Sequence, residues 1–76
     1  MEDRTKTKEA ITTVVREAGE PICFRELVRA CRRIDPQLSY YSWVYGVALK
    51  ELEVEGVVIV ERDRRRDNRL SVRASW

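Results

Sequence analysis

Residues 49–58 read LKELEVEGVV, and the chain changes here from a helical pattern to a strand pattern. Leu49 and Leu52 have the spacing of neighbours on one helix face. Gly56 predicts the end of the helix, because glycine readily takes the left-handed conformation found just after helix C-termini. The β-branched run at 57–60 favours a strand. We therefore expect a helix that leads directly into a strand.

A second strand pattern lies near the C-terminus. Leu70, Val72 and Ala74 alternate with polar residues, as the inward-facing side chains of a half-buried strand do. The residues between the two strand patterns are polar and favour a turn. The pattern predicts a β-hairpin with strands at about 57–62 and 69–74.

Three helices are expected before the hairpin, at about residues 7–18, 24–34 and 39–55. Gly19 and Pro21 end the first helix. Pro36 ends the second, because the residue before proline is pushed away from helical dihedrals. Ser39 is a good N-cap for the third. Gly46 lies inside the third helix and costs about 1 kcal/mol relative to alanine.

The expected core consists of apolar side chains that share one face of each element. On the third helix this face carries Tyr41, Tyr45, Ala48, Leu49 and Leu52. The complete predicted core is Ile11, Val14, Val15, Ala18, Phe24, Leu27, Val28, Cys31, Leu38, Tyr45, Leu49, Leu52, Val58, Val60, Leu70 and Val72.

Composition limits the class of protein. The 76 residues are 43% hydrophobic and 37% charged, which suits one small core and a heavily solvated surface, so we expect a single domain over residues 1–76. No apolar run approaches the ~18 residues that cross a bilayer. The N-terminus lacks the pattern of a secretory signal. We therefore expect a soluble, cytoplasmic protein with no membrane partner.

The residue types also limit the chemistry. The chain has no His, which excludes Cys/His zinc sites and His-based acid–base catalysis. Carboxylates are scattered, and no glycine-rich phosphate loop is present. We expect no catalytic residue, metal, cofactor or small-molecule ligand, and no enzymatic activity. Cys31 is expected to be a buried hydrophobe, whereas a redox role for Cys23, just before a helix, remains open.

The composition also bears on the source. Met, Asn and Gln occur once each, while Glu, Arg and Val are abundant. Few thermolabile residues and many charges are typical of thermophiles, so we expect a thermophilic archaeon or one of its viruses. The excess of Arg over Lys also fits a biased genome base composition.

The order of these elements resembles a winged helix-turn-helix domain. LKELEVEGVV at 49–58 is similar to the end of the recognition helix and the first wing strand of MarR-like, ArsR-like and archaeal winged-helix regulators. PICFRELV at 21–28 resembles their short strand and second helix. The resemblance covers about residues 7–74. It implies an α+β fold of three helices followed by a C-terminal hairpin wing, a fold that serves DNA binding or protein interaction.

Arginines gather at the expected hairpin tip. From residue 62 onward there are six Arg and two Asp, a local charge of +4, whereas the whole chain carries +2. The resemblance implies that a wing lies along a minor groove or flanking phosphates, and guanidinium groups suit both. The predicted DNA contacts on the wing are Arg62, Arg64, Arg65, Arg66 and Arg69. A solvated turn is the alternative interpretation.

Further DNA contacts are predicted on the second and third helices. Arg25, Arg29 and Arg32 follow i, i+4, i+7 spacing opposite the apolar stripe, where they would contact phosphates or form a solvated face. On the third helix, the residues able to hydrogen-bond DNA are Lys50, Ser39, Ser42 and Tyr40.

The outward face of the third helix is otherwise apolar, with Trp43, Val47 and Val54. Base-reading helices usually present polar side chains there. Three explanations remain open: a dimer or partner interface, to which Trp76 would add; contact with thymine methyl groups; or a wrong helix phase, with Trp43 partly buried under the hairpin.

We expect the function to be double-stranded DNA binding in transcription regulation, by a homodimer associated with the nucleoid. The apolar third helix also allows a sequence-nonspecific, chromatin-like role. A protein-interaction winged helix that docks through Trp43, Val47 and Tyr40 is the alternative.

Overall fold

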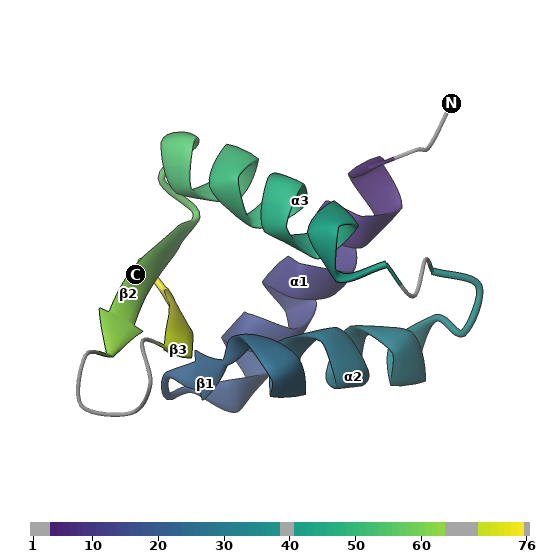
Figure 1. Cartoon of the computed structure of the whole chain (residues 1–76), viewed down its shortest axis with the longest axis horizontal. Coiled ribbons are helices and arrows are strands. Elements are labelled where there is room, and N and C mark those ends of the chain that lie inside the picture. The colour runs from purple at the N-terminus through teal and green to yellow at the C-terminus, as the bar shows by residue number, and fades with distance from the viewer. Residues whose placement is uncertain (1–3, 39–40, 64–68, 76) are drawn as a thin grey trace.

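Three helices are followed by a β-hairpin in the part of the chain that the computed structural model describes, residues 4–38, 41–63 and 69–75 (Figure 1). The elements in chain order are α1 Arg4–Ala18, β1 Ile22–Cys23, α2 Phe24–Ile34, α3 Ser42–Val54, β2 Val58–Asp63 and β3 Arg69–Ala74. The α+β class is confirmed, and both hairpin strands begin and end within one residue of their predicted bounds.

The strands form an antiparallel sheet in the order β1-β3-β2. β3 lies in the middle, where Val72 pairs with Ile22 on one side and with Val60 on the other. The short strand expected before the second helix is therefore present as β1. Because β1 leads directly into α2, its pairing with β3 holds the start of α2 beside the hairpin.

The helix ends at the two predicted glycine stops are confirmed. Gly19 and Gly56 have φ values of 65° and 81°, in the left-handed region that other residues rarely adopt. After α3, the backbone N–H of Val57 donates to the carbonyl of Leu52 at 2.9 Å, which closes the last turn. The chain can therefore pass from α3 into β2 within a few residues.

The start of α3 differs from the prediction. The helix begins at Ser42, and Tyr41 is its N-cap with an extended backbone (φ −81°, ψ 115°). A turn closes before it, where the N–H of Leu38 donates to the carbonyl of Asp35 at 3.1 Å. Because Tyr41 precedes the helix, helical periodicity does not place it on the core face, and it is 61% exposed. The predicted N-cap, Ser39, lies outside the described residues.

α1 begins at Arg4, before the predicted residue 7, and ion pairs connect this first turn to α3. The Arg4 guanidinium lies 2.9 Å from a Glu51 carboxylate oxygen. The Lys8 ammonium lies 2.5 Å from Glu55 and 3.7 Å from Glu51. The hydrogen bond to Glu55 raises the pKa of Lys8. These contacts join α1 to the C-terminal half of α3 from the solvent side.

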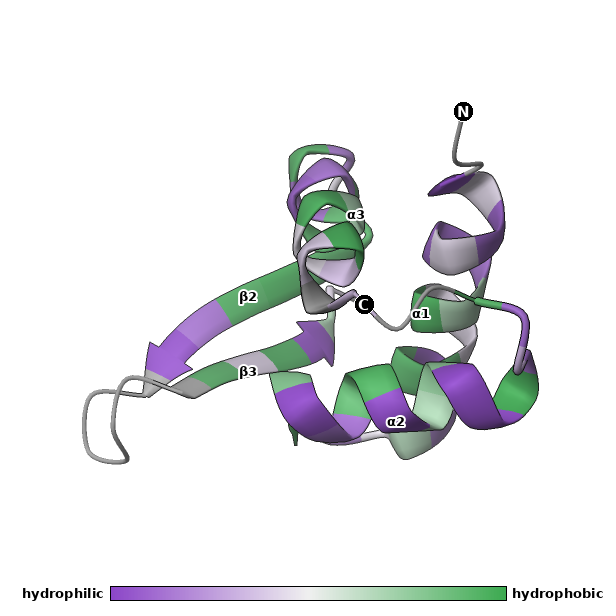
Figure 2. Cartoon of the chain, turned by 45° about the vertical axis from the view of Figure 1, so that its right-hand side comes forward, coloured by the Kyte–Doolittle hydropathy of each residue, from purple (hydrophilic) through white to green (hydrophobic). Residues whose placement is uncertain are grey.

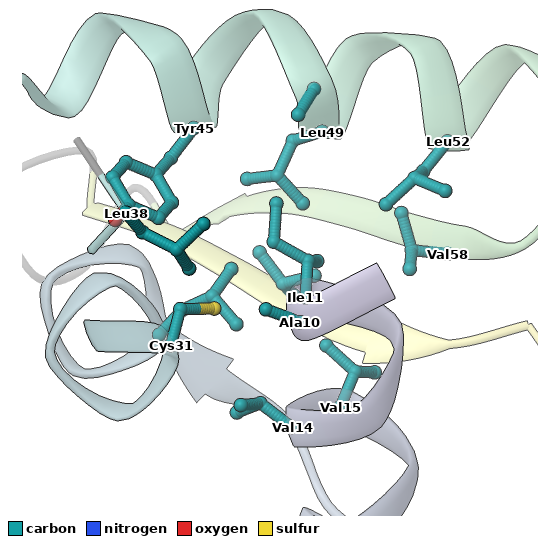
Figure 3. Close-up of a cluster of buried hydrophobic side chains, with 13 residues drawn as sticks. Ala10, Ile11, Val14, Val15, Cys31, Leu38, Tyr45, Leu49, Leu52 and Val58 are labelled. Carbon is teal, nitrogen blue, oxygen red and sulfur yellow. The ribbon is translucent and has the colours of Figure 1, made fainter. Parts of the chain in front are cut away.

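The hydrophobic core lies between the three helices and the inner face of the sheet (Figure 3). Eleven predicted core residues are buried: Ile11, Val14, Val15, Leu27, Cys31, Leu38, Tyr45, Leu49, Leu52, Val58 and Val72. The other five, Ala18, Phe24, Val28, Val60 and Leu70, are only partly buried. Ala10, Val44 and Ala48 are buried although the predicted core omitted them. Val44 fills the side of α3 that the prediction assigned to Tyr41.

Candidate nucleic-acid interface

The two strands of the hairpin continue beyond the helices (Figure 2), and their described ends carry two of the five predicted wing arginines. β2 turns from apolar to hydrophilic along its length. Arg62 lies near the end of β2 and is exposed, and Arg69 is the first residue of β3. The last pair of the ladder joins Asp63 to Arg69. The predicted contacts Arg64, Arg65 and Arg66 lie outside the described residues.

The hairpin register separates its arginines onto two faces. Val58, Val60 and Arg62 alternate along β2 with Ile59 and Glu61, so Arg62 shares the face of the inward valines. On the opposite face, both Nε and a terminal nitrogen of Arg73 lie 3.1 Å from a Glu61 carboxylate oxygen. Glu61 therefore offsets the charge of Arg73.

The arginines of α2 form an exposed side, as predicted. Arg25, Arg29 and Arg32 are exposed, while Leu27 and Cys31 on the other side of the helix are fully buried. This separation follows from helical spacing, because i, i+4 and i+7 share one face. The exposure of the basic side is confirmed, and its contact with phosphates remains a prediction.

Carboxylates lie close to one part of this basic side. A hollow of about 540 Å³ between α1 and α2 is lined by Arg29 and Arg33 and also by Glu17 and Glu26. The two carboxylates lower the positive potential that Arg29 and Arg33 would otherwise produce there. An anion is therefore attracted less strongly to this part of α2 than its arginine count suggests.

The start of α2 meets the wing around Leu70. Arg25 and Leu70 line a hollow of about 300 Å³ together with Cys23 and Phe24. Leu70 is also the direct cross-strand partner of Arg62. Directly opposed side chains in an antiparallel sheet lie on the same face, with Cβ atoms about 5 Å apart. Leu70 thus has an α2 arginine and a β2 arginine as neighbours, a convergence that helical and strand periodicity did not predict.

The outward face of α3 is exposed as predicted. Trp43, Val47 and Val54 are 62%, 38% and 82% exposed, and Lys50 between them is also exposed. The explanation that Trp43 is partly buried under the hairpin, through a wrong helix phase, is therefore wrong. Of the other residues predicted to contact DNA from this region, Ser42 starts the helix, while Tyr40, like the interface candidate Trp76, lies outside the described residues.

Gly46 on α3 lies in open space. A Cβ built at Gly46 would meet no heavy atom within 4 Å in the part of the chain that the structure describes. Close packing within these residues therefore does not require glycine at this position. The position is free for a larger side chain or for the approach of another molecule.

A shallow groove of about 680 Å³ runs between α1 and the C-terminal end of α3. Its polar side chains already bond to the protein: Thr12 and Thr13 donate to the carbonyls of Lys8 and Glu9 at 2.8 and 2.9 Å. The Lys8–Glu55 ion pair forms part of its wall. The groove thus presents mutually satisfied groups, and we assign no ligand to it.

Two other kinds of site were searched for in the described ranges. Residues 4–38, 41–63 and 69–75 contain no group of three or more His, Cys, Asp or Glu side chains placed to hold a metal ion. Within the same ranges, no helix combines the length and apolar character needed to cross a bilayer.

Comparison of the chain with protein-family models, curated proteins and solved structures found no match. The functional argument therefore depends on the residues and geometry of this chain.

Proposed function

We propose that this chain is a winged-helix protein that binds double-stranded DNA and acts in transcription regulation at the nucleoid. The observation that supports this most directly is the placement of arginine around the start of α2 and the hairpin. Arg25 and Arg62 are exposed neighbours of Leu70, and Arg64, Arg65 and Arg66 follow Arg62 in the sequence. A concentrated set of guanidinium groups on so small a surface attracts a polyanion.

The outer face of α3 favours binding with little sequence preference. Trp43, Val47 and Val54 present no hydrogen-bonding group to base edges, and Lys50 is the one cation among them. Phosphate contacts position a protein without reading sequence. The affinity would then come mainly from α2 and the wing, and a chromatin-like role is compatible with the same surface.

A salt titration with duplex DNA tests the DNA-binding proposal. The wild-type chain is expected to bind mixed-sequence duplex at low salt, with log K falling by roughly 0.9 per neutralised phosphate as log salt rises. Replacing Arg64, Arg65 and Arg66 by Ala should flatten the slope by up to about 2.7 and weaken binding equally on different sequences. Absence of measurable binding at low salt would refute the proposal.

A second candidate function is protein interaction or homodimerisation through α3. The exposed row of Trp43, Val47 and Val54 supports it, because large apolar side chains together on a surface often mark an interface. A two-fold dimer would also double the contacts available to DNA. Analytical ultracentrifugation of wild type and Trp43→Ala tests this: a dimer that dissociates in the variant supports it, and a wild-type monomer at high concentration excludes the homodimer.

A further inference from the structure

The hollow between the start of α2 and the base of the hairpin combines apolar and cationic groups. Phe24 and Leu70 are partly buried in its wall, and exposed Arg25 lies beside them. The hollow exists because β1 pairs with β3, where Cys23 lies opposite Ser71. Sheet register thus brings two segments that are distant in the sequence into one surface feature.

The chemistry of this hollow suits one unit of a sugar–phosphate backbone. A volume of about 300 Å³ is small for an organic cofactor but sufficient for a pentose ring. The apolar carbons of the sugar would contact Phe24 and Leu70. The phosphate would accept hydrogen bonds from guanidinium groups, which match its oxygens in pairs. The hollow beside Arg29 offers no comparable site, because Glu17 and Glu26 line it.

We propose that this hollow holds one sugar–phosphate unit of bound duplex DNA, with Arg25 and Arg62 contacting the same phosphate. The inference rests on the proposed function and specifies it further: α2 and the wing act as a single backbone clamp. Leu70 sets the separation of the two guanidinium groups, because it is the cross-strand partner of Arg62 and lines the hollow with Arg25.

Cys23 offers a direct reporter of occupancy, because it lines the hollow and is partly accessible. The other cysteine, Cys31, is completely buried, and burial raises the pKa of its thiol to about 12. A maleimide at neutral pH should therefore modify the native protein at Cys23. We expect saturating mixed-sequence duplex at low salt to slow this modification at least about tenfold, as followed by intact-protein mass spectrometry.

A double-mutant cycle tests whether the two arginines share a phosphate. We expect Arg25→Ala and Arg62→Ala each to weaken duplex binding by about tenfold, and the double variant by clearly less than the product of the two losses. Lys6→Ala is the matched control, because Lys6 is exposed on α1 and does not line the hollow. It removes the same charge, and its effect should multiply independently with that of Arg62→Ala.

The outcomes separate this inference from the proposed function. If the wild type does not bind duplex at low salt, DNA binding itself is refuted and the clamp falls with it. If the wild type binds while Cys23 reacts at an unchanged rate, DNA binding stands and the hollow is not its site. If the Arg25 and Arg62 losses multiply as fully as the control pair, the shared phosphate is refuted.

Discussion

At the residue scale, two glycines of the chain have opposite conformational roles. Gly46 lies inside α3, and a Cβ there would meet nothing within 4 Å among the described residues. Gly56 follows α3 with a φ of 81°, a conformation that costs an L-residue free energy. The same substitution should therefore have opposite effects at the two positions.

We predict that Gly46→Ala raises the free energy of unfolding by about 1 kcal/mol, because alanine is the better helix former. Gly56→Ala should lower it by about 1 kcal/mol, because the left-handed conformation is strained with a Cβ. Urea denaturation followed by circular dichroism measures both. A dilute monomeric sample is needed, since a second molecule packed against Gly46 would reverse the sign there.

At the element scale, the hairpin carries arginines in two electrostatic settings. Arg73 on β3 forms an ion pair with Glu61 on β2. Arg62 on β2 lies on the other face, opposite Leu70. A carboxylate held at 3.1 Å offsets the attraction of Arg73 for a phosphate, and the two substitutions therefore test position within a single hairpin.

We predict that Arg62→Ala lowers the salt slope of duplex binding by about 0.9, the value for one lost phosphate contact. Arg73→Ala should change the slope clearly less, although it removes the same formal charge. Fluorescence anisotropy at four or five salt concentrations would measure both slopes. Equal slope changes would indicate that net charge alone, and not the wing geometry, determines the affinity.

The elements also differ in how far local pattern could predict them. Gly19, Gly56 and the alternation in β3 are local signals, and the structure follows them. The start of α3 was misplaced because a good N-cap residue at position 39 carried more weight than the turn that Asp35 makes after α2. Periodicity then put Tyr41 in the core, although its extended backbone leaves it exposed.

At the scale of the whole molecule, the contacts that define the candidate site depend on register. The exposed arginines of α2 could be read from helical spacing alone. The position of Leu70 between Arg25 and Arg62, and the ion pair of Glu61 with Arg73, require the alignment of β2 and β3 and the pairing of β1 with β3. Composition and periodicity do not specify which residues face each other across strands.

The stability of the whole fold should also respond to alkaline pH in one direction. Burial raises the pKa of Cys31 from 9.0 to about 12, and burial likewise raises the pKa of Tyr45 above 10.0. The ion pair with Glu55 raises the pKa of Lys8 above 10.5. In each case the unfolded chain loses the proton at lower pH than the native chain does. The native state therefore loses stability as pH rises, beginning near 9.

We predict that the urea midpoint is nearly constant from pH 7 to 8.5 and falls progressively from pH 9 to 11. Between pH 9 and 10 the Cys31 thiol dominates, because the unfolded values of Tyr45 and Lys8 lie higher. Cys31→Ala should flatten the decline in that window, whatever the cavity does to absolute stability. A variant that declines as steeply as wild type would show that the Cys31 thiol does not remain protonated in the native core.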